Sequence, residues 1–427
     1  MGYLEHLLTS KGISTVTRRL RAILRQLGPT PARMRRTLDA YMDVADAFAF
    51  HPTFPTPAVV VDRYPRLIRH LVERGADIAI HGLEHVDYVH IPPEEQQRHV
   101  EEAIRIFRKR DIPFSGFRAP YLRWDASLLD ALRAHRVGYD SSSAVLWDVL
   151  PDPLPPDAEA RVRRVLEFYD PRPAAEGPVL PSWEEGILRL PVSLPDDEIL
   201  VDRMGKGGEE VGRVWSAILE RTYRRGDLFV LQLHPERFFA CEGGLRLLLE
   251  EVRGRTPPVW TASLAEIARW WRRKQQLHVT VETLGPRQWR VRVPGDGEVG
   301  LLVRGMTTTP ASVPWYGSWR YVPSSEAIVT GPTRPTVGVT SDVHPRVLRF
   351  LRDLGYITET AAPDHVLVVR EREGSPEARR RLLQRLEESR VPLVRLNRWP
   401  RDSRSALAVT GDLDAVTWWD FLRRLGR

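Results

Sequence analysis

Short apolar strands alternate with amphipathic helices along the first two thirds of the chain, and this rhythm limits the folds open to it. Buried strands are predicted at residues 77–80, 188–192 and 227–233, and helices at residues 64–74, 94–109 and 126–135. Residues 57–61 fit either a strand or the start of a helix. Strands that alternate with helices are typical of a parallel α/β layer or a (β/α) barrel.

The chain has 427 residues, which is too long for one ordinary core, so two or three domains are expected. We predict that residues 1–275 form the α/β barrel. The pattern then changes to period-two strands separated by Gly and Pro, which predicts a small β-rich module at 276–335. Residues 336–400 read as a βαβαβ module without a glycine-rich phosphate loop. Residues 401–427 hold one strand and a short helix, which must dock onto another part of the molecule.

The charge balance is basic, with a formal net charge of +7, but it does not indicate a nucleic-acid partner. Only four of the 63 basic residues are Lys, and the many Arg are scattered along the chain, often beside Asp or Glu, rather than gathered in a stripe. Cys241 is the only cysteine, which excludes an intrachain disulfide and a thiolate metal cluster. The charge pattern therefore does not support a nucleic-acid partner.

The first residues do not form a signal peptide, because Glu5, His6 and Lys11 interrupt any apolar stretch. No run approaches the ~18 apolar residues of a membrane-spanning helix. Residues 16–27 read as a basic amphipathic helix, which we expect to pack on its own protein rather than on a membrane surface. A cytoplasmic protein is the resulting expectation.

Two carboxylates close to the C-terminus form the first chemical motif. Asp412 and Asp414 follow the apolar run 406–409 directly. In a metal-dependent hydrolase, one such carboxylate binds the metal and the other takes a proton from water. The pair therefore predicts that a strand ends here and that catalytic groups follow it.

Two histidines four residues apart form the second motif. His81 and His85 begin where the predicted strand 77–80 ends, so both side chains can converge on one ion from a single turn. Two neutral imidazoles leave the charge of a divalent cation without compensation. Asp414 would supply that charge and complete a site of two histidines and one carboxylate.

Three further motifs are weaker when each is taken alone. RAPY at residues 118–121 places Arg118 beside a turn, LQLH at 231–234 places His234 at the end of a strand, and DSSS spans 140–143. The ordinary alternatives are a surface arginine, a core histidine and a helix-capping serine cluster.

Taken together, these motifs resemble those of the polysaccharide deacetylases, the NodB-homology carbohydrate esterases. The resemblance covers residues 50–271 and the C-terminal tail, and it is most specific in FRAPY at 117–121 and LQLHPE at 231–236. One departure is large, because the family places its Asp motif on the first strand, ahead of the histidines. Here the matching segment, VTGDLD, lies at 409–414.

The resemblance therefore implies a circularly permuted (β/α) barrel of deacetylase type. Its first strand would come last in the sequence, after the β-rich and βαβαβ modules. Permutation costs little where the original termini lie close together at the surface. Two alternatives remain: the tail completes the barrel of a neighbour in a swapped homodimer, or it is the remnant of a lost second copy.

The same resemblance implies a metal-dependent enzyme that removes an N-acetyl group from a sugar or polysaccharide. Asp414, His81 and His85 would bind a divalent metal, with zinc as the expected ion.

The remaining catalytic roles also follow from the resemblance. Asp412 would be the general base, steered by Arg118. A backbone N–H near Tyr121 would face the oxyanion, and His234 would protonate the leaving amine.

Several points stay open at the level of sequence. The carboxylate that orients His234 is Asp140, Asp196 or Asp197. A hydrolase of a non-sugar amide and a non-catalytic glycan-binding or scaffold protein are the alternative functions. An open groove lined by aromatic residues would favour a glycan, whereas a small closed pocket would favour the amide. The glycan itself, whether a precursor, a nucleotide- or lipid-linked sugar or a soluble oligosaccharide, is not specified.

Overall fold

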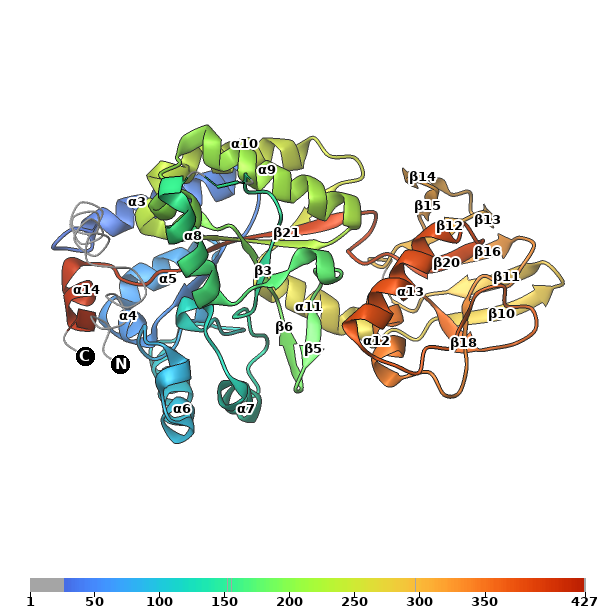
Figure 1. Ribbon diagram of the computed structural model, residues 1–427, viewed down its shortest axis with the longest axis horizontal. Helices are drawn as coiled ribbons and strands as arrows, with labels where there is room; N and C mark the ends of the chain where they lie inside the picture. The colour runs from blue at the N-terminus through green and yellow to red at the C-terminus, as the bar shows by residue number, and fades with distance from the viewer. Residues whose placement is uncertain (1–26, 152, 155, 296, 426–427) are drawn as a thin grey trace.

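The computed structural model describes residues 27–151, 153–154, 156–295 and 297–425. Figure 1 shows two bodies: an α/β body that contains the early part of the chain and its last strand, and a second body formed by the segment between them. The predicted helix at 16–27 lies outside the described residues, except for Leu27. Among the residues that the structure describes, no helix is long and apolar enough to cross a membrane.

A parallel sheet forms the centre of the first body. Among the described residues its order is β2-β1-β21-β8-β7-β3-β4, with β9 paired to β21. The strands are β1 (Thr53–Thr56), β2 (Asp77–Ile80), β3 (Ala144–Leu146), β4 (Arg172–Pro173), β7 (Val192–Leu194), β8 (Leu228–Leu233), β9 (Val259–Thr261) and β21 (Ser405–Gly411). Neighbours along this path run parallel. The prediction of a mixed α/β fold with a parallel sheet is confirmed.

The C-terminal strand β21 lies inside this sheet, between β1 and β8. Figure 1 shows this red strand within the α/β body. Thr410 is opposite Thr53 on one side, and Gly411 is opposite Leu233 on the other. All seven residues of β21 are buried. The tail therefore docks within its own chain and completes the sheet that the earlier strands begin.

The predicted closed barrel is not confirmed, because the ladder of strands is open and ends at β2 and β4. Single-residue bridges join Ile80 to Phe117, Phe117 to Asp140 and Asp140 to Arg189. The predicted strand at 188–192 divides into β6 (Ile187–Arg189) and β7. Pro191 lies at the break, where its missing N–H cannot contribute to a ladder.

Helices surround the sheet, and those at Pro65–Glu73, Pro93–Lys109 and Ala126–Ala134 match the helices predicted at 64–74, 94–109 and 126–135. The helices are α3 (Ala32–Phe48), α4 (Ala58–Arg63), α5 (Pro65–Glu73), α6 (Pro93–Lys109), α7 (Ala126–Ala134), α8 (Pro156–Tyr169), α9 (Gly208–Arg225), α10 (Phe238–Arg253), α11 (Leu264–Gln275) and α14 (Trp418–Leu425). The ambiguous segment 57–61 is mostly the helix α4, because the strand before it, β1, already occupies the place in the sheet.

The second body contains three smaller sheets. Antiparallel strands β10 (Thr280–Gly285), β11 (Gln288–Arg292), β16 (Glu326–Thr330) and β13 (Thr307–Thr309) form one, and β14 (Val313–Tyr316), β15 (Trp319–Val322), β12 (Leu301–Arg304) and β20 (Leu393–Leu396) form another. Parallel strands β18 (Thr358–Thr360), β17 (Val337–Val339) and β19 (Val368–Val369) form the third, with α12 (Pro345–Asp353) and α13 (Pro376–Glu388). Because β12 pairs with β20, one sheet takes strands from both predicted modules. The boundary at 335 stays a prediction.

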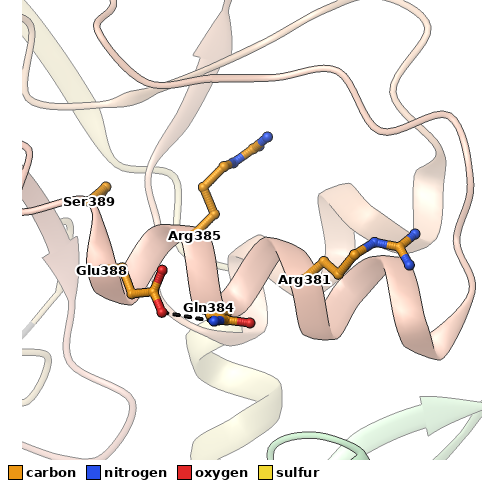
Figure 2. Close-up of a pocket in the computed structure, with 5 residues that line it drawn as sticks. All are labelled: Arg381, Gln384, Arg385, Glu388 and Ser389. Atoms are coloured by element: carbon orange, nitrogen blue, oxygen red, sulfur yellow. Dashed lines mark hydrogen bonds between the residues drawn. The ribbon is translucent and has the colours of Figure 1, made fainter.

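A surface groove lies on α13 in the second body. Figure 2 shows the residues that line it, all from or next to this one helix: Arg381, Gln384, Arg385, Glu388 and Ser389. The Gln384 amide donates a hydrogen bond to Glu388 within the groove. None of the predicted site residues contributes to it.

Gly411 is expected to tolerate no side chain, because it ends β21 where the strand meets Phe54. A Cβ atom at Gly411 would lie 2.8 Å from a ring carbon of Phe54, which is fully buried. Gly411→Ala is therefore expected to lower the free energy of unfolding by about 1–3 kcal/mol, as overpacking of a core does. Urea denaturation measures this. Gly285→Ala is the control, since a Cβ there meets nothing within 4 Å, and an equal loss in both variants would contradict the explanation.

Candidate active site

Three neighbouring regions of the sheet end at one edge and carry the predicted chemical groups. His81 follows β2, Asp412 follows β21 and His234 follows β8. Because these strands are parallel, their C-terminal ends lie on the same side of the sheet, where α/β proteins usually bind ligands. The polypeptide therefore brings together groups that are far apart in the sequence.

The two histidines and the last carboxylate form a compact trio. His81 Nε2 lies 3.4 Å from Asp414 Oδ1, and His85 Nε2 lies 3.1 Å from Asp414 Oδ2. One potential ligand atom from each residue lies within 4.8 Å of the others. The predicted meeting of the C-terminal tail with the histidine turn is thus seen within one chain.

The orientation of His81 suits metal binding. Its Nδ1 lies 2.8 Å from the carbonyl oxygen of Arg118, and a carbonyl only accepts, so Nδ1 carries the hydrogen. In the neutral imidazole the lone pair is then on Nε2, which faces Asp414. A ligating histidine that donates its other N–H to a backbone carbonyl is the usual arrangement at metal centres. Two imidazoles and one carboxylate are a donor set that zinc accepts, so the residues present fit a divalent metal.

Asp412 lies beside this trio and is held by Arg118. Arg118 Nη1 donates to Asp412 Oδ1 at 2.6 Å and to the hydroxyl of Thr410 at 2.8 Å. Arg118 also donates to the backbone and hydroxyl oxygens of Ser141, and its side chain is fully buried. The second oxygen of Asp412 is 3.9 Å from His81 Nε2. Asp412 is therefore adjacent to the trio and fixed by a guanidinium.

The serine turn at 140–143 supports the RAPY turn. Ser142 donates its hydroxyl hydrogen to Asp140 at 2.5 Å and accepts a hydrogen bond from the backbone N–H of Ala119 at 2.7 Å. Asp140 also pairs with Arg189 at 2.8 Å. Its carboxylate is thus committed to this network, which holds Arg118 and the residues after it in place.

Among the three candidate partners of His234, the structure places Asp197 against it. His234 Nδ1 lies 2.7 Å from Asp197 Oδ1, and the backbone N–H of His234 donates to Asp197 Oδ2 at 2.7 Å. Asp196 instead accepts from the backbone N–H of Ile199. Burial alone would lower the pKa of His234, but the Asp197 carboxylate raises it to about 10. His234 is therefore set up to hold a proton at neutral pH.

Asp197→Asn is expected to move the alkaline limb of the pH–rate profile to lower pH. The negative charge of Asp197 raises the pKa of His234, so its removal lowers that pKa. In its predicted role of general acid, His234 then loses its proton earlier as the pH rises. Initial rates between pH 6 and 11 measure the limb. Asp130→Asn, on the exposed face of α7, is the control. An unchanged limb in Asp197→Asn would mean that His234 does not titrate in the reaction.

Tyr121 lies against the histidine turn in a strained backbone conformation. Its φ of 60° and ψ of 11° belong to the left-handed region, and Leu122 follows with a φ of 57°. Such conformations cost energy and gather at functional sites. The Tyr121 ring meets the His85 ring edge-on, with centroids 4.4 Å apart. The turn thus brings its backbone to the mouth of the site.

Gln232, which lies within the LQLH motif, is a polar residue of the site for which no role was predicted. Gln232 lies opposite Thr410 in the sheet, and its Nε2 donates to Asp412 Oδ2 at 3.0 Å. A signal was present, because Gln232 is a polar residue in an otherwise apolar strand and shares a strand face with His234, two residues on. Its partner, however, comes from a distant part of the chain.

The candidate site is enclosed. The exposed fraction is 1% for His81 and Asp412 and 7% for His85 and His234. The Asp414 side chain is 13% exposed. A small cavity of about 30 Å³ adjoins His85 and Asp414. Charges in such a site interact strongly because little water screens them.

Comparison with known proteins confirms the predicted resemblance over part of the chain. Residues 28–140 match the family model described as polysaccharide deacetylase. This stretch includes the histidine turn and RAPY, whereas His234 and the C-terminal carboxylates lie beyond it. A peptidoglycan deacetylase-like protein of Gibberella zeae is 31% identical over 94 residues, which are 21% of this chain and 27% of that protein. The chain therefore matches about a quarter of that relative's length.

Solved structures of similar shape are more distant. A Mycobacterium smegmatis protein described as a polysaccharide deacetylase has a TM-score of 0.44 at 20% identity, over 57% of this chain and 79% of that one. An allantoinase has a TM-score of 0.44 at 18% identity, over 56% of this chain and 72% of that one.

Proposed function

We propose that the protein is a metal-dependent hydrolase that removes the N-acetyl group from a sugar or polysaccharide. One observation carries the proposal: Asp412 and Asp414 of the last strand lie against His81 and His85 at one sheet edge. The family match over residues 28–140 supports the same class of reaction. These groups are those that hydrolysis of an amide by activated water requires.

The trio of His81, His85 and Asp414 would hold the metal, and zinc is the ion that we propose. A divalent cation bound there would polarise the acetyl carbonyl and lower the pKa of a water molecule beside it. Asp412 takes the proton of that water, because its carboxylate is held next to the trio by Arg118. Arg118 keeps the carboxylate oriented.

His234 and the RAPY turn act on the other end of the amide. His234 protonates the leaving amine, which leaves poorly without that proton, and Asp197 keeps the imidazole charged and oriented. The backbone N–H at Tyr121 faces the developing oxyanion.

We also propose that the sheet is a circularly permuted deacetylase barrel, in which β21 takes the place of the first strand. Three observations support this. The motif that the family carries first follows β21, and β21 lies between β1 and β8 rather than at an edge. The bridges from Ile80 through Phe117 and Asp140 to Arg189 extend the ring beyond the regular ladder.

A second candidate function is hydrolysis of a small non-sugar amide, such as a cyclic ureide. The enclosed site favours it, because the side chains of His81, Asp412 and His234 are at least nine-tenths buried. A long polysaccharide needs an open groove, whereas a small amide can be surrounded. The chemistry proposed for the side chains is the same for both substrates.

One assay separates these functions. Zinc-loaded protein is incubated with N-acetylglucosamine, with its oligomers and with a cyclic ureide, and released acetate and ring-opened product are measured. Acetate release supports the deacetylase, and release from the monosaccharide but not the oligomers would show that the enclosed site limits substrate size. Ring opening alone supports the second function. Zinc binding without turnover of any substrate would favour the non-catalytic alternative.

A further inference from the structure

Gln232 contacts the proposed general base from the side opposite Arg118. Its side chain is 3% exposed and lies in β8 between Leu231 and Leu233, which are fully buried. Nε2 of Gln232 lies 3.0 Å from Asp412 Oδ2, while Arg118 Nη1 lies 2.6 Å from Asp412 Oδ1. Each oxygen of the carboxylate therefore has its own donor.

The chemistry of the pair fixes the direction of the amide. An ionised carboxylate only accepts hydrogen bonds, so the NH₂ group of Gln232 must face Asp412 and its carbonyl Oε1 must point elsewhere. Within the described part of the chain, Oε1 is buried without a hydrogen-bond partner. An unpaired buried acceptor destabilises the fold, so an apolar residue would pack here at lower cost. The hydrogen bond to Asp412 is therefore the interaction that an apolar residue at position 232 could not provide.

The two oxygens of Asp412 differ in what they face. Oδ2, which Gln232 contacts, is the oxygen 3.9 Å from His81 Nε2, so it is the one turned toward the proposed metal ligands. Oδ1 is turned toward Arg118, whose Nη1 also donates to the hydroxyl of Thr410. With both oxygens held, the carboxylate cannot rotate about its terminal bond. The remaining lone pair of Oδ2 is then presented to the reaction centre.

We infer that Gln232 is a positioning residue that holds Asp412 in the orientation of a general base, with Oδ2 as the basic atom. This inference rests on the proposed function and adds to it the residue that acts through Asp412. Arg118 alone leaves one oxygen free to turn away. Gln232 removes that freedom, and a proton acceptor displaced by a small distance loses much of its efficiency.

Gln232→Met tests the inference, because methionine has a similar length but cannot donate. We expect kcat to fall about 10- to 100-fold, as for other residues that orient a catalytic group, while KM and zinc affinity stay within about two-fold. Gln232→Asn keeps the amide but is too short to reach Asp412, so the same loss is expected. Rates are taken per zinc-loaded folded molecule, so that reduced folding of either variant does not count as lost catalysis.

Gln96→Met is the matched control. Gln96 is also fully buried and donates to the backbone oxygens of Tyr88 and Ile91 and to Asp125, none of which is a proposed catalytic group. Its loss should lower the melting temperature and leave kcat within about two-fold.

A double-mutant cycle decides whether Gln232 acts through Asp412. In an Asp412→Asn background, measured at high enzyme concentration, Gln232→Met should reduce the residual rate by less than about two-fold, because its partner is already inactive. The inference is overturned if either Gln232 variant keeps full kcat. It is also overturned if Gln232→Met lowers the rate as much in the Asp412→Asn background as in the unchanged protein. If the protein without substitutions hydrolyses no substrate, the proposed function itself is overturned. If it is active and Gln232→Met is equally active, only the role of Gln232 is overturned.

Discussion

Asp412→Asn is expected to bind zinc as the unchanged protein does and to lose turnover by about 10²- to 10⁴-fold, the usual contribution of a general base. The amide cannot take a proton from water, whereas the trio of His81, His85 and Asp414 is unaltered by the change. Zinc content by atomic absorption and hydrolysis rates of zinc-loaded protein measure the two effects separately. The contrast between intact binding and lost turnover is the signature of a base that is not a ligand.

The matched variants change the ligands instead. Asp414→Ala, His81→Ala and His85→Ala should each lose zinc and, with it, activity, because three protein ligands are the minimum for such a site. A near-normal rate in Asp412→Asn would remove the assignment of the base. Zinc retained at full affinity in Asp414→Ala would remove the tail from the metal centre.

Removal of residues 401–427 is expected to abolish zinc binding and to unfold the α/β body. The deleted segment contains β21, which pairs with β1, β8 and β9 and is buried along its whole length. Its loss would expose unpaired strand edges in the middle of the sheet and leave a large cavity in the core. Circular dichroism and zinc titration of the shortened chain measure the outcome. A folded, fully zinc-loaded truncation would contradict it.

A circularly permuted chain tests the same strand by moving it instead of removing it. The segment 401–427 is joined by a short linker ahead of residue 27, and the chain then ends at residue 400. The start of α14 lies beside Gly28, because the backbone N–H of Trp418 donates to the carbonyl of Gly28 at 3.1 Å, so a linker has a short distance to span. Such a chain should fold and bind zinc if β21 takes the place of a first strand. If the permuted chain does not fold or bind zinc while the unpermuted chain does both, the result would count against the proposed permutation.

The sequence predicts those parts of the molecule whose signals are local. The alternation of strands and helices predicted a parallel sheet. The motifs at 81–85 and 410–414 each contain their candidate metal-binding or catalytic groups within a few residues. Strand β1 was not predicted, because Thr53–Thr56 contains a proline and one large apolar residue. Its conformation is stabilised by β2 and β21 on either side, which is information from distant segments.

Other parts of the site depend on contacts that no local pattern reveals. Asp197 could not be chosen over Asp196 from the sequence, because the choice depends on how the turn after β7 faces β8. Gln232 and Asp412 are separated by 180 residues, so their hydrogen bond becomes visible only once β8 and β21 are paired. The pairing of β12 with β20 is of the same kind, since it joins segments that the sequence pattern separates.

In the proposed metal centre, the last strand brings a carboxylate to the histidine turn of the same chain. Anomalous X-ray diffraction at the zinc edge, from crystals of the full chain loaded with zinc, tests this most directly. We predict a peak bound by His81, His85 and Asp414 of one chain, with Asp412 beside it and not ligating. A zinc peak without Asp414, or one ligated by Asp414 of a second chain, would contradict the account.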